Sequence, residues 1–212
     1  MDRSKSSDSI RRTGKEIWER GLAALLLLPL LPVFAICAAA IKIEGLLDPR
    51  ARGPVFFAEK RVSRGRVFDL LKFRTLPAAA LESLGPGPTH IATIERTGRL
   101  TRVGRVIKQW YLDELPQLWN IVRGDMFLIG TRPWPLELYE QEIARGVTRK
   151  RDMPAGLVGP VQSHKGDSGT DPLQLDLEYW EAYRTYPTWR LLLLDLRILA
   201  RSLRVQLQHK GL

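Results

Sequence analysis

The sequence predicts a mainly α-helical fold with a small β-hairpin (α+β), built on an N-terminal re-entrant membrane helix and amphipathic interfacial helices. Three observations carry this prediction: a charge-free apolar run at residues 22–41, two short β-type runs within residues 54–73, and helical patterns through the second half. The 212 residues divide into a basic N-terminal tail (1–16), a membrane helix (17–43) and one domain (44–212).

The composition limits the class of protein before any motif is considered. With 33 Lys and Arg against 23 Asp and Glu, the net charge of +10 indicates an anionic partner. Phosphate, nucleic acid and an acidic membrane surface are all compatible with that charge. The single cysteine, Cys37, excludes an intrachain disulfide, and 44% apolar residues exclude a disordered chain.

The apolar run at residues 22–41 is long enough to meet a membrane. As a helix rising about 1.5 Å per residue, it covers about 30 Å, one hydrocarbon core. It exceeds the ~7–15 apolar residues of a signal peptide, which disfavours cleavage. Both flanks are basic, whereas a spanning helix usually has one basic end. Pro29 and Pro32 interrupt the middle, so we expect a re-entrant hairpin; a kinked helix that crosses once is the alternative.

A β-hairpin is predicted directly after the membrane segment. Residues 54–57 (PVFF) and 66–73 (RVFDLLKF) are aromatic and β-branched runs, and VSRG between them supplies a turn. Residues 77–88, which end in GPGP, are expected to form a mobile connection.

Helices are predicted in the second half of the chain. Helical patterns begin near Asp113 and at residues 135–149. A further helix is expected to begin at Asp171, as the N-cap, with Pro172 in the first helical position.

The last predicted helix is amphipathic and basic. Its arginines recur at intervals of four and three residues, and its leucines fall on another side: Arg197, Arg201, Arg204, Leu192, Leu196, Leu199 and Leu203. The helix either lies in the headgroup plane of a membrane or covers the protein core with its apolar stripe.

Chemistry concentrates at Asp113 and Glu114, two adjacent carboxylates just before Pro116. Proline favours a first helical turn, so Asp113 is expected at a helix N-terminus, where free amides stabilise an anion and attract phosphate. An ionised aspartate beside a phosphoryl group is a nucleophile candidate, and Glu114 offers a hard oxygen ligand to a divalent cation. The alternative is that Asp113 only caps the helix and Glu114 is a first-turn acid.

Several ordered motifs carry a resemblance to a known family. They are GPVFF (53–57), KR (60–61), KFRT (72–75), LDELPQLWNIVRGDM (112–126), LIGTRP (128–133), DLEY (176–179) and LDLRIL (194–199). Together with the apolar hairpin, they resemble the bacterial sugar transferase family, the monotopic polyprenyl-phosphate phosphoglycosyl transferases. The resemblance covers residues 17–204.

This resemblance implies an enzyme at the cytoplasmic face of the bacterial inner membrane, in contact with phospholipid. Asp113 would attack the sugar-bearing phosphate of a nucleoside diphosphate sugar, usually a UDP-sugar, and release UMP. Polyprenyl phosphate would then accept the phosphosugar, which begins glycoconjugate or exopolysaccharide synthesis. The family's Mg²⁺ site maps onto Glu114 and Asp176.

The resemblance also implies the basic residues that hold substrate, and it shows where this chain diverges. The expected substrate-binding residues are Lys72, Arg74, Lys108, Arg132 and Lys165. Lys108 stands where the family usually has arginine, and Thr131 replaces the first proline of Pro-Arg-Pro. The family's arginine within residues 153–167 is missing, and Lys165 is its nearest substitute.

Two other classes of function remain open. A noncatalytic membrane scaffold would explain the apolar hairpin and the C-terminal helix. A membrane-tethered nucleic-acid-binding protein would explain the positive charge, but no recognition helix or stacking aromatics accompany the arginines, so no nucleic acid is expected as a partner.

Overall fold

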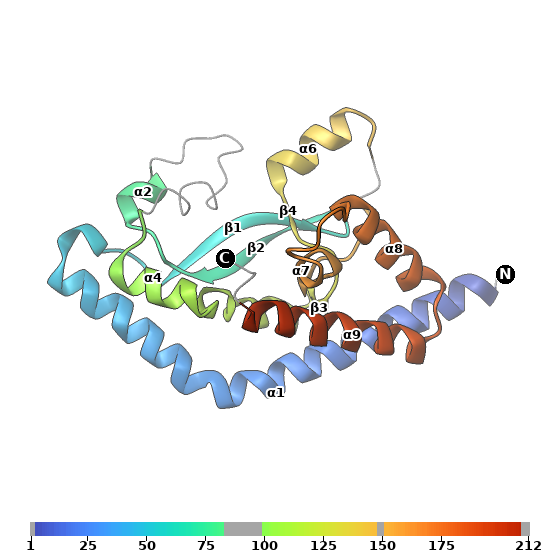
Figure 1. The fold of residues 1–212 in the computed structure, drawn as a ribbon, viewed down its shortest axis with the longest axis horizontal. Coiled ribbons are helices and arrows are strands. Elements are labelled where there is room, and N and C mark those ends of the chain that lie inside the picture. Colours follow the sequence, from blue (N-terminus) through green and yellow to red (C-terminus); the bar gives the residue numbers. More distant parts are fainter. Residues whose placement is uncertain (1–2, 83–98, 148–150, 209–212) are drawn as a thin grey trace.

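The fold is described from a computed structural model, for residues 3–82, 99–147 and 151–208. Helices surround two small β-sheets, and one long bent helix, α1 (Arg3–Leu47), forms one border of the molecule (Figure 1). The helical fold with a small hairpin is therefore confirmed. α1 extends beyond the predicted membrane segment at both ends, so the residues predicted as a basic tail continue the helix from residue 3.

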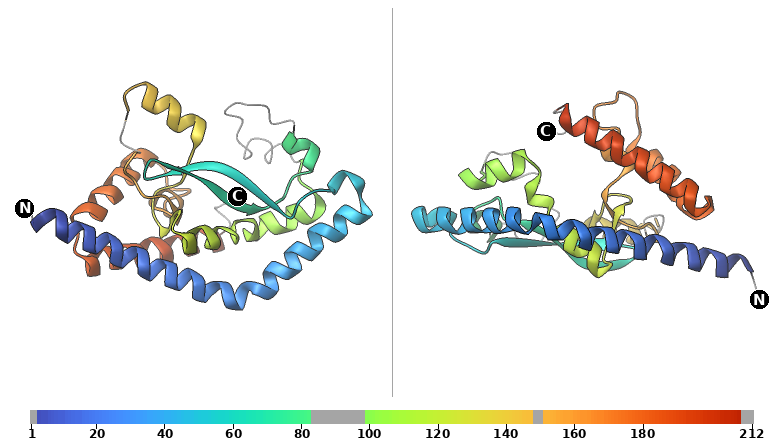
Figure 2. Two further views of the ribbon diagram at one scale, coloured as in Figure 1. Left: turned by 180° about the vertical axis from the view of Figure 1, so that it is seen from behind. Right: turned by 90° about the horizontal axis from the view of Figure 1, so that it is seen from below.

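α1 bends in its middle, where Pro29 and Pro32 lie, and the rest of the chain sits on the concave side of the bend (Figures 1 and 2). Proline removes a backbone hydrogen bond and clashes with the preceding turn, which explains the bend. Residues 14–47 are long and apolar enough to cross a membrane, and 11% of their most apolar window is buried. Most of this helix therefore presents apolar side chains outward.

Each arm of α1 packs against a different part of the domain. Ala23, on the N-terminal arm, packs with Leu118 and Ile121 of α5 (Gln117–Arg123). Cys37 and Ile41, on the C-terminal arm, pack with Phe73 of β2 (Arg66–Phe73) and Ile107 of α4 (Arg102–Gln109). The membrane-type helix is thus part of the hydrophobic core rather than a tethered anchor.

The predicted hairpin is present, with β1 at Phe56–Ser63 and β2 at Arg66–Phe73. Arg64 and Gly65 both have positive φ, at 50° and 70°, as a two-residue turn between twisted strands requires. β4 (Trp134–Pro135) pairs with β1, and β2 is left at the edge of the sheet.

A second sheet, which the sequence did not predict, pairs β3 (Phe127–Ile129) with β5 (Gly156–Val158) in parallel. The strands approach so closely that a Cβ atom on Gly156 would lie 2.1 Å from the amide nitrogen of Gly130. Glycine is therefore required at this crossing.

Seven further helices are described: η1 (Pro49–Ala51), α2 (Ala78–Glu82), η2 (Leu112–Glu114), α6 (Leu136–Ala144), α7 (Pro160–Ser163), and the two longer helices α8 (Pro172–Thr185) and α9 (Thr188–Leu207). Asp171 caps α8 as predicted, because its side chain accepts from the Leu173 amide at 2.9 Å. The predicted mobile connection at 77–88 contains α2, and its part beyond residue 82 lies outside the described residues.

A buried ion cluster joins α1 to the C-terminal helices. Lys15 of α1 contacts Glu19 at 2.6 Å and Asp195 of α9 at 2.5 Å. Tyr179 of α8 donates to Asp195 at 2.8 Å, and Glu19 accepts from the amide of Leu128 in β3 at 2.8 Å. Burial raises the pKa of Asp195 and of Tyr179. Because each buried charge has a partner, the cluster fixes how α1 sits on the domain.

α9 has three faces rather than the predicted two. Leu191, Asp195 and Ile198 are buried against the core. A separate apolar stripe is exposed: Trp189, Leu193, Leu196, Leu203 and Leu207. The exposed arginines of α9 form the third face. Leu196 and Leu203, which core packing would bury, are 60% and 53% exposed, so they do not cover the core.

The free edge of β2 is closed by one side chain, Asn120 of α5, which is fully buried. Its carbonyl oxygen accepts from the Leu71 amide at 2.9 Å, and its amide donates to the Asp69 carbonyl at 2.7 Å. The same amide donates to Asp125 at 2.9 Å. Asn120 therefore replaces a neighbouring strand and fixes α5 against the hairpin.

Replacing Asn120 with Ala should lower the free energy of unfolding by about 1–3 kcal/mol, because it leaves a buried backbone donor and acceptor without partners. Asn120→Asp should also destabilise, since a carboxylate cannot donate to Asp69 and would face Asp125. Thermal unfolding in detergent measures both changes. An unchanged midpoint for Asn120→Ala would contradict this role of the side chain.

Candidate active site

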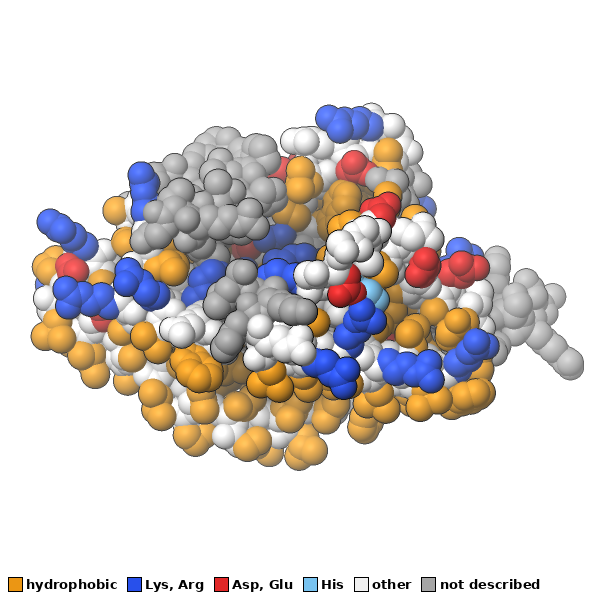
Figure 3. Space-filling model, in the orientation of Figure 1, with side chains coloured by type: hydrophobic (Ala, Val, Ile, Leu, Met, Phe, Trp, Pro, Cys, Tyr) orange, Lys and Arg blue, Asp and Glu red, His pale blue; other side chains and the backbone are white. Residues whose placement is uncertain are grey.

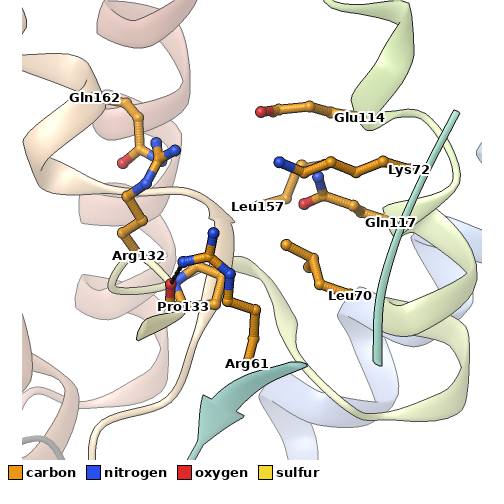
Figure 4. A pocket seen from close by; sticks show the side chains of 10 residues that line it. Arg61, Leu70, Lys72, Glu114, Gln117, Arg132, Pro133, Leu157 and Gln162 are labelled. Atoms are coloured by element: carbon orange, nitrogen blue, oxygen red, sulfur yellow. Dashed lines mark hydrogen bonds between the residues drawn. The ribbon is translucent and has the colours of Figure 1, made fainter. Parts of the chain in front are cut away.

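A polar pocket opens between the hairpin, the segment of η2 and the start of α5, the turn after β3, and β5 with α7. Its open space is about 310 Å³. Its ten lining residues come from four separate stretches of the chain: Arg61, Leu70, Lys72, Glu114, Gln117, Arg132, Pro133, Gly156, Leu157 and Gln162. Glu114, Lys72 and Gln117 point from one side toward Arg132 and Gln162 on the other (Figure 4). Three cations thus share the pocket with one carboxylate.

The strand register explains why the hairpin contributes two of these cations. Arg61 is opposite Phe68, and Lys72 is opposite Phe57, so their side chains emerge on the same face of the two strands. Leu70 lies on this face too. Arg61 donates to the carbonyl of Pro133 at 3.1 Å, which connects the hairpin to the turn that carries Arg132.

Asp113 and Glu114 share the single turn of η2, and α5 begins only at Gln117. Asp113 thus lies in the first turn of a short 3-10 helix, as the prediction of a helix N-terminus requires, but this helix is separate from α5. Pro116 is the N-cap of α5, because its fixed φ suits the position just before the helix. Glu114 lines the pocket, whereas Asp113 does not; Asp113 is 3% exposed and lies 3.9 Å from the ammonium of Lys108.

The backbone is strained immediately before the acidic pair. Tyr111 adopts a left-handed conformation, with φ 56° and ψ 20°, although it is not a glycine. This conformation costs of order 1–3 kcal/mol and is concentrated at functional sites. Burial also raises the pKa of the Tyr111 hydroxyl, as does the charge of Glu114. Tyr111 lies between Trp110, the C-cap of α4, and η2, which contacts β2 of the hairpin.

Arg74 is not part of the pocket, although the resemblance implied contact with substrate. It is 2% exposed, and it donates at 2.7 Å to each of three backbone carbonyls, those of Ala51, Pro54 and Leu76. Burial lowers the pKa of its guanidinium. Its position is architectural, because it satisfies the carbonyls of the connection between α1 and the hairpin.

The other predicted residues divide between the pocket and its surroundings. Lys72, Glu114 and Arg132 line the pocket. Lys108 lies beside Asp113, and Lys165 is exposed on the loop after α7, outside the lining. Asp176 is 5% exposed on α8 and does not line the pocket.

The donor atoms near the pocket suit only one kind of metal site. Within residues 3–82, 99–147 and 151–208, no three His, Cys, Asp or Glu side chains gather closely enough to hold a metal. Mg²⁺ is commonly bound by one or two carboxylates together with substrate phosphates. Glu114 is a hard oxygen donor that points into a cationic pocket, so it could bind Mg²⁺ together with the phosphates of a substrate.

Sequence reasoning missed three polar residues of the pocket: Arg61, Gln117 and Gln162. Strand alternation could have found Arg61, since it predicts that Arg61 and Lys60 point to opposite faces. No pattern in the sequence places Gln162 here, because that depends on how β5 pairs with β3.

Comparison with known proteins identifies the family of this chain. The family model described as "Bacterial sugar transferase" matches residues 10–209. A UDP-glucose:undecaprenyl-phosphate glucose-1-phosphate transferase of Caulobacter vibrioides is 32% identical over 199 residues, with 89% of this chain and 67% of the relative covered. An undecaprenyl-phosphate glucose phosphotransferase of Komagataeibacter xylinus is 31% identical, with 86% of this chain and 35% of the relative covered.

The name of a third relative contains a different sugar. It is a UDP-N-acetylgalactosamine-undecaprenyl-phosphate N-acetylgalactosaminephosphotransferase of Aeromonas hydrophila, 30% identical, with 90% of this chain and 43% of the relative covered. The chain thus spans less than half of two of these three relatives. The family predicted from the motifs is confirmed: the chain belongs to the bacterial sugar transferase family.

Proposed function

We propose that this protein transfers a sugar phosphate from a UDP-sugar to polyprenyl phosphate at a membrane surface. The observation that carries the proposal is the Asp113–Glu114 pair on one turn beside a pocket that holds Arg61, Lys72 and Arg132. The three cations and the Glu114 carboxylate give the pocket lining a net charge of +2, opposite to the two negative charges of a sugar diphosphate. The names of the three relatives, which all join a sugar phosphate to undecaprenyl phosphate, support the same reaction.

In the first step, a carboxylate oxygen of Asp113 attacks the phosphorus that carries the sugar. The bond from that phosphorus to the bridging oxygen breaks, and UMP leaves with the bonding electron pair. The phosphosugar remains on the carboxylate as a mixed anhydride. The pocket cations stabilise the charge that develops on the phosphoryl oxygens and on the leaving phosphate.

In the second step, a phosphate oxygen of polyprenyl phosphate attacks the same phosphorus. The bond to Asp113 breaks, the carboxylate is restored, and the product is a polyprenyl-diphosphate sugar. A mixed anhydride would be lost if water reached it first. Asp113 is 3% exposed, and this burial protects the intermediate from hydrolysis.

Mg²⁺ is part of the proposal because the negative charge of the diphosphate repels a carboxylate nucleophile. When bound, Mg²⁺ supplies positive charge to the diphosphate and to the leaving phosphate. Glu114 is the carboxylate that we propose as its ligand, because it alone among the described acids lines the pocket. Asp176 has only the resemblance in its favour.

The apolar surface supports our proposal that this chemistry takes place at a lipid bilayer. Apolar side chains follow the lower border of the molecule along α1 and α9, and Lys and Arg side chains lie above them (Figure 3). Trp18 of α1 and Trp189 of α9 are 55% and 65% exposed. We propose that α1 enters the cytoplasmic leaflet of the inner membrane and returns, while α9 lies among the phospholipid headgroups.

A noncatalytic scaffold or a nucleic-acid-binding protein would also use an apolar border and positive charge. Neither gives a reason for a buried aspartate next to a glutamate that faces three cations. The catalytic proposal accounts for this arrangement.

The nucleophile can be tested with Asp113→Asn. An amide is a poor nucleophile of similar shape, so release of UMP from UDP-sugar with polyprenyl phosphate should fall by about 10³-fold or more. Asp152→Asn, which changes an exposed aspartate, is the matched control and should turn over normally. Near-normal turnover of the Asp113 variant would rule out the covalent step.

Glu114→Gln should raise the Mg²⁺ concentration needed for half-maximal turnover by about tenfold, because an amide binds this cation more weakly than a carboxylate does. The matched control is Glu140→Gln, an exposed position on α6. Undiminished turnover of the wild type in excess EDTA would remove Mg²⁺ from the mechanism.

Topology can be tested with single cysteines at Ser6 and Ser168 in a Cys37→Ala background. Ser6 is near the start of α1, and Ser168 is exposed in the catalytic domain. If α1 is re-entrant, an impermeant maleimide should label neither cysteine in intact cells and both after lysis. Labelling of Ser6Cys alone in intact cells would establish a helix that crosses the membrane once.

A further inference from the structure

Behind two of the pocket cations lies a carboxylate that the proposed mechanism does not use. Glu59 of β1 contacts the guanidinium of Arg61 at 2.5 Å and the ammonium of Lys72 at 3.9 Å. The side chains of all three are nearly buried, with exposed fractions of 11–14%. Glu59 itself does not line the pocket. It can therefore act on a ligand only through the two cations.

The strand register builds this arrangement. Glu59 lies opposite Leu70, so it occupies the same face as Arg61 on its own strand and Lys72 on the neighbouring strand. Two cations held this close in a poorly solvated site repel each other, and an anion between them offsets that repulsion. The hairpin thus carries a cation–anion–cation row along one face.

The three members of the row are held differently. Arg61 is fixed at two points, by Glu59 and by the carbonyl of Pro133 at 3.1 Å. Lys72 stands beyond hydrogen-bond length from Glu59, so its ammonium keeps its donors for a ligand. The Glu59 oxygen that faces Lys72 is buried and accepts no hydrogen bond. Its interaction with Lys72 is therefore one of charge alone.

We propose that Glu59 is a positioning residue of the donor pocket, which holds Arg61 and Lys72 ready for a diphosphate and reduces their net charge so that the nucleotide product leaves. This inference rests on the proposed function, because it takes the ligand of the pocket to be a uridine nucleotide. A pocket with two unopposed cations would bind UDP-sugar and UMP more tightly, and product release would then limit turnover.

The test uses Glu59→Gln in the full chain in detergent, since the amide keeps the shape and an oxygen acceptor for Arg61 but removes the charge. UMP should bind about tenfold tighter by calorimetry, with a steeper loss of affinity as salt is added. KM for UDP-sugar and kcat should both fall. A residue that only supported the fold would not lower KM.

The matched control is Asp69→Asn in the same hairpin. Asp69 pairs with Lys60 at 2.8 Å across the strands, but both side chains are exposed and on the opposite face. This variant should leave UMP affinity, KM and kcat unchanged. If a folded Glu59→Gln protein binds UMP as weakly as wild type or more weakly, the role proposed for Glu59 is wrong. If the wild type binds no UMP, the proposed function fails first, and this inference fails with it.

Discussion

The arrangement of this protein depends on the buried ion pair between Lys15 of α1 and Asp195 of α9. A charge buried to this degree is tolerated only with a partner, so α1 cannot leave the domain without exposing or unpairing it. Glu19 extends the pair to the backbone of β3, and Tyr179 extends it to α8. A helix that is otherwise apolar enough for a membrane is thereby fixed to the domain that carries the pocket.

A few polar contacts and one strained residue also determine the shape of the pocket. Asn120 closes the edge of the hairpin, Arg61 connects the hairpin to the turn before β4, and strained Tyr111 directs η2 toward both. Asn120 and Tyr111 do this without lining the pocket, whereas Arg61 also lines it. Together they hold Lys72 and Glu114 at the pocket, where we propose that a diphosphate and Mg²⁺ bind beside Asp113.

Local signals in the sequence predicted the elements well. The N-cap at Asp171 and the hairpin were predictable because their determinants lie within a few residues of chain. The acidic pair was recognisable as a motif, but its place in a separate single turn was not, because the left-handed backbone at Tyr111 leaves no mark in the sequence. For Arg74, the motif predicted a substrate-binding role, but its guanidinium donates hydrogen bonds to three backbone carbonyls. Such acceptors can be recognised only in the tertiary structure.

The central claim is that Asp113 carries the phosphosugar between the two substrates. Its most direct test is peptide mapping by mass spectrometry after acid quenching of wild-type protein incubated with UDP-sugar and Mg²⁺, without polyprenyl phosphate. The account predicts one phosphosugar mass on the peptide that contains Asp113, which disappears when polyprenyl phosphate is added. UMP release under the same conditions with no added mass on any peptide, or with the mass on a different residue, would contradict it.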